Sequence, residues 1–228
     1  MFPVRDLNKA LTTPHVNRML ILANVVIFVV MLLSDYGLIA GGLAEDIEGK
    51  FAMRPYYIVQ GEKLYTLFTS MFLHARFLSG LLHIFGNMLY LYVFGDNVED
   101  VFGHASYLVF YLVSGLAASF AHIMSITSFN PNDGVIGASG AIAGVLGAYL
   151  VLYPKAKVLT VIFLGWPIIV PVPAVMFLGF WFFMQWLYGF FDVSGGVAYW
   201  AHIGGFIAGM ILALLFARKR KQAREPRF

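Results

Sequence analysis

The chain has 228 residues, of which 60% are hydrophobic and 12% are charged, with a formal net charge of +3 and a mean hydropathy of +0.79. A soluble domain carries about 25% charged residues, so this composition excludes an ordinary soluble globular protein and indicates a membrane protein. The absence of cysteine excludes disulfides, thiolate metal sites and a thiol nucleophile.

Long uncharged stretches mark the expected membrane spans, each of which needs about 20 mostly apolar residues. The windows are 19–34, 77–95, 101–132, 134–154, 158–191 and 193–217. The first is a little short and borrows flanking residues. The fifth exceeds one crossing, and Pro167, Pro171 and Pro173 divide it into a connection near 158–171 and a span near 174–191. The first run also fits a signal-peptide core, a reading that the five following spans disfavour.

The windows predict an all-α membrane protein, a six-helix transmembrane bundle in one domain. Residues 1–18 form a cytoplasmic lead, 19–217 the membrane domain and 218–228 a basic cytoplasmic tail. Six spans place the connecting segments alternately on the two sides of the membrane, with both termini on the same side. That side carries 11 of the 15 Lys and Arg, so the positive-inside rule places both termini in the cytoplasm. The basic tail is expected to contact anionic lipids rather than nucleic acid.

Segments outside the apolar windows are interpreted as connections between the spans. One unusually aromatic segment inside a window is interpreted as a surface. The stretch 35–76 is expected to lie on the outer membrane interface, and Asp96–Asp100 to form a tight cytoplasmic turn. His74 and His104 are interpreted as loop or interface residues. The aromatic run 180–186 is interpreted as a lipid-facing or packing surface.

A glycine-flanked serine, Ser139, opens the fourth window, and His202 lies near the start of the sixth, which runs in the same direction. Sixteen residues separate Ser139 from Lys155 and His202 from Arg218. At 1.5 Å per residue, both polar residues lie about 24 Å above their cytoplasmic anchors, and therefore at similar depth. Polar and ionisable side chains are costly inside a membrane, so this pair favours a functional site.

Small residues recur along both helices. They are Ser139, Ala143 and Gly147, with Gly140 and Gly144 beside them, in the fourth span, and Gly205, Gly209 and Ala213 after His202 in the sixth. Small residues let helix backbones approach closely in lipid. The pattern predicts that these two spans pack together and bring the serine hydroxyl within reach of the imidazole.

The pair predicts a serine hydrolase in which Ser139 is the nucleophile and His202 the general base. The Ser139 backbone N–H, with His83 and Asn87 at i and i+4 on the second span, is expected to stabilise the oxyanion. Both acidic residues near the dyad spans fall in outer loops, which favours a Ser–His dyad over a triad. The sequence has no H-E-x-x-H motif, which disfavours an intramembrane zinc protease, and no pair of intramembrane Asp residues, which disfavours an aspartyl protease.

The chain resembles the rhomboid family of intramembrane serine proteases over roughly residues 61–217. The resemblance is carried by the segments 69–74 (TSMFLH), 83–88 (HIFGNM), 94–100 (FGDNVED), 137–140 (GASG) and 201–209 (AHIGGFIAG). It implies a six-helix core with Ser139 as nucleophile, His202 as base, an oxyanion site at His83, Asn87 and the Ser139 amide, and no metal or cofactor. The segment between His74 and His83 is longer than the usual family spacing, and the Trp-Arg pair of the family's first loop is missing.

The predicted function is therefore hydrolysis of peptide bonds in or near transmembrane segments of membrane proteins, with such proteins and membrane lipids as partners. An inactive rhomboid-like protein that binds transmembrane helices is the alternative. A channel would need a polar stripe through the membrane, whereas the inner halves of the fourth and sixth spans are Ala, Gly and Leu. The short tails favour a prokaryotic plasma membrane as the host membrane.

Overall fold

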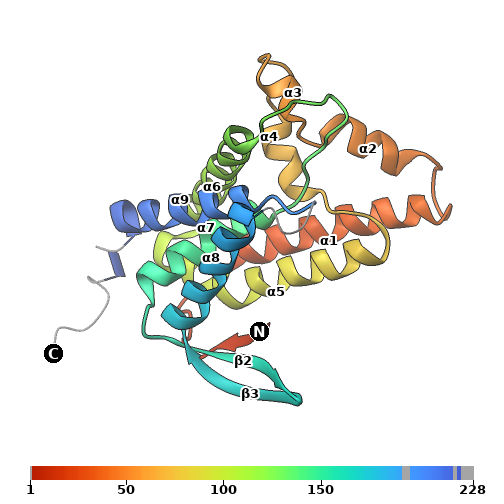
Figure 1. Ribbon diagram of the computed structural model, residues 1–228. Coiled ribbons are helices and arrows are strands. Elements are labelled where there is room, and N and C mark those ends of the chain that lie inside the picture. The colour runs from red at the N-terminus through yellow and green to blue at the C-terminus, as the bar shows by residue number, and fades with distance from the viewer. Residues whose placement is uncertain (1, 192–195, 218–219, 222–228) are drawn as a thin grey trace.

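The computed structural model describes residues 2–191, 196–217 and 220–221, most of which are helical (Figure 1). The long helices are α1 (His15–Asp35), α5 (Phe77–Phe102), α6 (His104–Ser125), α7 (Ser139–Leu152), α8 (Ala174–Phe191) and α9 (Tyr199–Leu212), which continues into a π-helical turn, Ala213–Ala217. Each overlaps one predicted window, so the expectation of a predominantly helical chain is confirmed. Among the described residues, α1, α6, α8 and the segment Tyr199–Ala217 are long and apolar enough to cross a membrane, and α7 is a shorter apolar helix.

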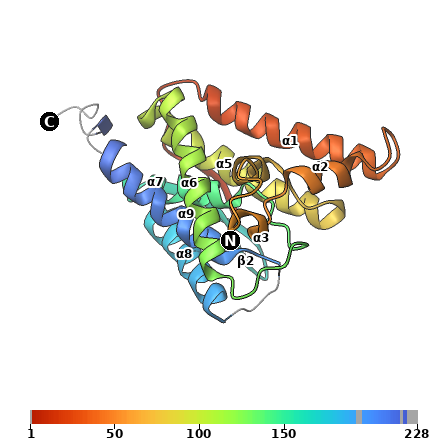
Figure 2. The same cartoon turned by 90° about the horizontal axis from the view of Figure 1, so that it is seen from above.

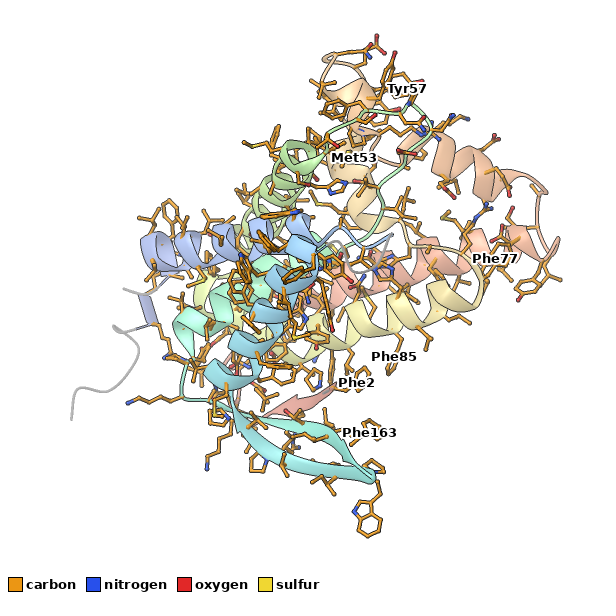
Figure 3. The ribbon with its side chains drawn as sticks, viewed as in Figure 1. Phe2, Met53, Tyr57, Phe77, Phe85 and Phe163 are labelled. Carbon is orange, nitrogen blue, oxygen red and sulfur yellow. The ribbon has the colours of Figure 1, made fainter. Side chains whose placement is uncertain are left out.

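Large apolar side chains are exposed on the outside of the helices and of strand β2 (Lys157–Leu164). Phe77, Phe85 and Phe163, labelled in Figure 3, project from the surface and are 56%, 64% and 62% exposed. Soluble monomers rarely expose apolar patches larger than a few hundred Å². A surface of this kind fits a lipid environment.

The acidic segment at the end of α5 is helical, so the prediction of a tight turn at Asp96–Asp100 is wrong. The Glu99 carboxylate accepts hydrogen bonds from the backbone N–H groups of Val16 (3.0 Å) and Asn17 (2.7 Å), in the first turn of α1. The first N–H groups of a helix lack intrahelical partners and carry the positive end of its dipole. Glu99 therefore caps α1, which compensates its burial and allows α5 to continue to Phe102.

The long connection from α1 to α5 is folded rather than extended. It contains α2 (Leu43–Phe51), α3 (Pro55–Ile58), α4 (Thr66–Thr69) and a 3-10 turn, Ser70–Phe72. Arg76, just before α5, forms ion pairs with Asp35 at the end of α1 (2.7 Å) and Glu45 in α2 (2.6 Å). These charges hold the connection over the ends of α1 and α5.

A three-stranded antiparallel sheet corrects the all-α prediction. β1 (Phe2–Asp6) pairs with β2 (Lys157–Leu164), which pairs with β3 (Trp166–Pro173) across a turn at Gly165, whose φ is +89°. The sheet lies at one end of the bundle, beside the N terminus (Figure 1). The prolines interpreted as breakers all lie on β3, an edge strand, where a missing N–H is tolerated.

β1 is anchored to the helices through Asp6. The Asp6 carboxylate accepts hydrogen bonds from the Tyr149 hydroxyl on α7 (2.6 Å) and from the Asn97 side-chain amide on α5 (2.8 Å). Burial, with a smaller contribution from Asp96, raises the pKa of Asp6 from 3.8 to about 6, against the lowering effects of the Tyr149 bond and Arg5. The N-terminal strand is thus held by a group that titrates near neutral pH.

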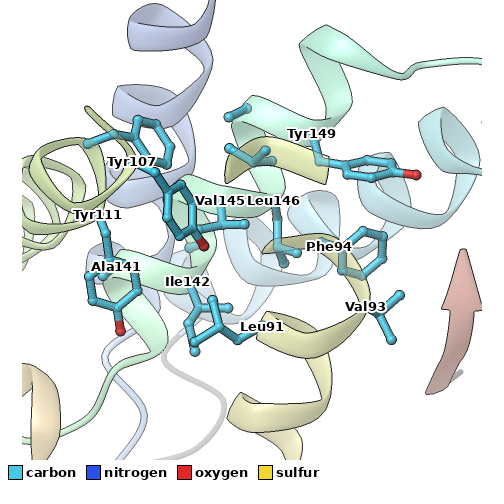
Figure 4. Packing of buried hydrophobic residues seen from close by; sticks show 14 of the residues in the cluster. Leu91, Val93, Phe94, Tyr107, Tyr111, Ala141, Ile142, Val145, Leu146 and Tyr149 are labelled. Carbon is cyan, nitrogen blue, oxygen red and sulfur yellow. The ribbon is translucent and has the colours of Figure 1, made fainter. Parts of the chain in front are cut away.

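The core is centred on α7, which contacts α5, α6, α8 and α9. Residues Gly140–Tyr149 of α7 are all buried. In Figure 4, Val145 and Leu146 of α7 lie among aromatic residues of neighbouring helices, including Tyr107, Tyr111 and Phe94. Seen from above, α1 lies on one side of the molecule and α8 on the other (Figure 2). From its second residue on, α7 is therefore enclosed by the other helices.

Glycines bring the backbones of α7 and α9 into direct contact. A Cβ added to Gly205 or Gly209 would overlap the carbonyl oxygens of Gly140 or Gly144, and one added to Gly147 would overlap the carbonyl oxygen of Phe206. The closest contacts thus involve Gly140 and Gly144, the two glycines that lie beside the series of small residues that begins with Ser139. Only glycine permits this separation.

We predict that Gly205→Ala destabilises the fold by about 1–3 kcal/mol, because the new methyl group meets backbone rather than a movable side chain. Unfolding in mixed micelles at increasing SDS concentration measures the change. Gly179→Ala in α8 is the matched control, since its Cβ would meet no atom within 4 Å. Equal stability of the two variants would contradict the proposed close contact.

We also predict that the stability of the β1 attachment depends on the protonation of Asp6. The folded protein binds the Asp6 proton more tightly than the unfolded chain does. The contribution of protonated Asp6 to stability is therefore complete below pH 3.8 and is lost as the pH rises through about 6. Limited proteolysis of the N-terminal segment between pH 4 and 7 should become faster with rising pH in the wild type. Asp6→Asn should remove this dependence, and an unchanged slope in that variant would refute the assignment.

Candidate functional site

Ser139 is the first residue of α7, and the preceding loop directs it into the bundle. Gly137 has a φ of +127°, a conformation that favours glycine, and its N–H donates to the Ser70 carbonyl oxygen at 2.9 Å. The N–H groups of the first turn of a helix have no intrahelical partner. The start of α7 therefore presents a hydroxyl next to unpaired amide donors.

His202, in the first turn of α9, contacts this hydroxyl directly. Its Nε2 lies 2.8 Å from Ser139 Oγ. The contact follows from the close packing of Gly140 against Gly205, because these glycines are neighbours of the two side chains along their helices. The structure brings the predicted nucleophile and base into hydrogen-bond distance.

The second ring nitrogen of His202 also has a partner, which the sequence analysis missed. Its Nδ1 lies 2.8 Å from Oε1 of Gln185 on α8. Gln185 belongs to the aromatic run that was interpreted as a lipid-facing or packing surface, and it contacts α9 through this bond. Its neighbour Trp181 packs a ring against the imidazole, with 5.9 Å between ring centroids. The available signal in the sequence was that Gln185 is the single side-chain amide in an otherwise aromatic and apolar helix.

His83 and Asn87 lie on α5, on the other side of Ser139. A Cβ on Gly137 would lie 3.7 Å from His83 Nε2 and 3.8 Å from Ser139 Oγ, so the two side chains flank this glycine. The Asn87 side-chain amide nitrogen lies 3.0 Å from Nε2 of His74. All four predicted site residues line one cavity of about 740 Å³.

His74 lies in the loop before α5, in line with its interpretation as a loop or interface residue, but the sequence analysis missed its contacts. Its side chain is buried, 1% exposed, and its ring packs edge-on against His83. Burial and the neighbouring His83 lower the pKa of His74 to about 4, so the ring is neutral and can accept the Asn87 amide hydrogen at Nε2. The extra residues before His83 extend the first turns of α5, and His74 still reaches Asn87.

The cavity combines these polar groups with apolar walls. Its lining includes Leu82, Ile142, Leu146 and Trp181, together with the four predicted site residues and Gln185. A cavity with convergent polar groups at an otherwise apolar site is typical of a ligand or active site. Its size leaves room for an extended peptide segment and for water.

Comparisons with known proteins identify the family of the chain. A family model described as the Rhomboid domain matches residues 61–219. Relatives include Rhomboid protein 1, mitochondrial, of Saccharomyces cerevisiae (28% identical, 64% of this chain and 41% of the relative) and RHOMBOID-like protein 1 of Arabidopsis thaliana (31%, 70% and 36%). Rhomboid protease GluP of Bacillus subtilis is 35% identical over 68% of this chain and 26% of its own length.

The chain spans less than half the length of these relatives. They come from a yeast, a plant and a bacterium, so they give no support to a prokaryotic plasma membrane over other membranes. The match to the family model covers more than half of the chain. The chain therefore belongs to the rhomboid family.

Proposed function

We propose that the chain is an intramembrane serine endopeptidase that cleaves peptide bonds in or near transmembrane segments of other membrane proteins. The observation that carries this proposal is the 2.8 Å contact between Ser139 Oγ and His202 Nε2 on the wall of a large cavity between apolar helices. An inactive relative would need neither this contact nor unpaired donors beside it. The family includes a relative named as a protease.

In the proposed mechanism His202 Nε2 takes the proton of the Ser139 hydroxyl as Oγ attacks the scissile carbonyl carbon. The tetrahedral intermediate collapses, the C–N bond breaks, and the leaving amine takes the proton from Nε2. The remaining acyl-enzyme ester is attacked by a water molecule, which gives one proton to Nε2. Collapse of the second intermediate releases the carboxylic acid, and the proton returns to Ser139 Oγ.

The proposed oxyanion site consists of the Ser139 backbone N–H and the side chains of Asn87 and His83. Donors that are already in place stabilise developing charge most strongly where water is excluded. The bond between Asn87 and His74 supports this role, because it fixes the plane of the Asn87 amide and uses only one of the two amide hydrogens. The second hydrogen is left for the oxyanion. His74 would thus orient an oxyanion donor.

The proposed membrane arrangement has six spans, α1, α5, α6, α7, α8 and α9, with both termini on the cytoplasmic side. β1 pairs with β2, and the Arg220 guanidinium donates to the Phe102 carbonyl oxygen at 2.8 Å. These contacts support a common side for the two terminal segments, the α5–α6 junction and the α7–α8 connection. With 14 residues, α7 is about 21 Å long, shorter than a bilayer core of about 30 Å, which favours a recessed position for Ser139.

We predict that Ser139→Ala and His202→Ala each lower the rate of cleavage of a single-span substrate in liposomes by on the order of 10³-fold or more. Each change removes one partner of the proton transfer. Ser114→Ala is the matched control, because Ser114 is a buried serine of α6 outside the cavity and should leave the rate unchanged. A folded Ser139→Ala protein that cleaves at the wild-type rate would exclude Ser139 as the nucleophile, whereas a folded wild type that does not cleave would identify an inactive, helix-binding relative.

We further predict that Asn87→Ala lowers kcat by about 10²-fold, as the loss of one oxyanion donor does in other serine hydrolases, with a smaller change in KM. His74→Leu should have a weaker effect in the same direction, because it removes only the partner that orients Asn87. Steady-state cleavage kinetics measure both. Wild-type kcat in Asn87→Ala would exclude this residue from the oxyanion site.

A further inference from the structure

Gln185 is an unusual residue for its helix. The other residues of α8 are apolar, aromatic or glycine, so Gln185 carries the only side-chain amide among its 18 residues. An amide inside a membrane span costs free energy unless it is hydrogen-bonded, and polar residues in such spans are mostly functional. Gln185 faces the cavity that also contains Ser139 and His202.

The bond from Gln185 determines which nitrogen of His202 carries the proton. Oε1 of an amide accepts hydrogen bonds and cannot donate one, so the 2.8 Å contact requires a hydrogen on His202 Nδ1. A neutral imidazole then has a free electron pair on Nε2, the nitrogen 2.8 Å from Ser139 Oγ. This is the tautomer that can accept the serine proton.

Aromatic contacts restrict the ring without making this choice. Trp181 and Tyr199 pack against the imidazole, with centroid distances of 5.9 Å and 6.3 Å. Such contacts limit the tilt of the ring but do not distinguish its two nitrogens. Trp181 and Gln185 are four residues apart and share one face of α8, so one helix supplies both the ring contact and the hydrogen-bond acceptor.

We infer that Gln185 is a positioning residue for His202, an inference that rests on the proposed proteolytic function. It holds the imidazole in the Nδ1–H tautomer and aims Nε2 at Ser139. Because Gln185 lies on α8 whereas the dyad lies on α7 and α9, the base is oriented only while α8 is packed against α9. Unlike a carboxylate, the amide orients the ring without adding a negative charge to the membrane interior.

The first test compares three variants by cleavage kinetics in liposomes. Gln185→Leu, which keeps the size of the side chain but lacks an acceptor, should lower kcat by about 10- to 100-fold with little change in KM, as the loss of an orienting partner does at other sites. Gln185→Glu, which retains an acceptor, should recover most of the rate. Phe183→Leu is the control, since Phe183 is 51% exposed on α8 and should leave the rate unchanged.

The second test reads the tautomer directly, first in the wild type and then in Gln185→Leu. Nitrogen NMR of protein labelled with ¹⁵N-histidine should show the His202 proton on Nδ1, with the signal assigned by its loss in His202→Gln. In Gln185→Leu the same signal should move toward the Nε2–H form or a mixture of the two. A purely structural role for Gln185 would not change the tautomer.

The outcomes separate this inference from the proposed function. Absence of cleavage by the wild type would overturn the proteolytic function itself. Wild-type cleavage together with an Nε2–H tautomer of His202, or with unchanged kcat in Gln185→Leu, would overturn only the role of Gln185. If Gln185→Leu does not fold, the wild-type tautomer and the rate of Gln185→Glu decide the question.

Discussion

The direct backbone contact between α7 and α9 is the constraint on which the rest of the structure depends. Gly205 and Gly209 lie against carbonyl oxygens of Gly140 and Gly144 at a separation that no larger residue allows. Ser139 and His202 stand next to this contact, so their 2.8 Å approach is a consequence of glycine packing. Close packing of small residues is a main source of helix association in lipid, where a hydrophobic driving force between helices is absent.

Near this contact, the polar side chains of the candidate site are held in hydrogen-bonded pairs. Gln185 and Ser139 bind the two nitrogens of His202, and His74 binds Asn87 on the opposite wall of the cavity. Buried polar groups are costly when they lack partners, which explains why each of these residues brings one. The same principle operates at the other end of the bundle, where Glu99 caps α1 and Asp6 binds Tyr149 and Asn97.

The sequence allowed Ser139 and His202 to be paired because depth and small-residue spacing are local, countable properties. Each of the six long helices overlaps an apolar window predicted from the sequence. The helical segment Asp96–Asp100 was predicted as a turn because the Glu99 carboxylate is bound by N–H groups of α1, which is distant in sequence. β1 pairs with a strand about 150 residues away, and no local pattern predicts such a pairing. Gln185 and His74 were overlooked because their roles depend on partners from other helices.

The most direct test of the account is whether Ser139 is a nucleophile activated by His202. Folded protein in detergent, treated with a fluorophosphonate and analysed by intact mass and peptide mapping, should carry one adduct, on Ser139. The adduct should be absent from His202→Ala, since the serine hydroxyl then has no base at Nε2. An unmodified Ser139 in folded wild-type protein, or equal labelling without His202, would contradict the proposed catalytic site.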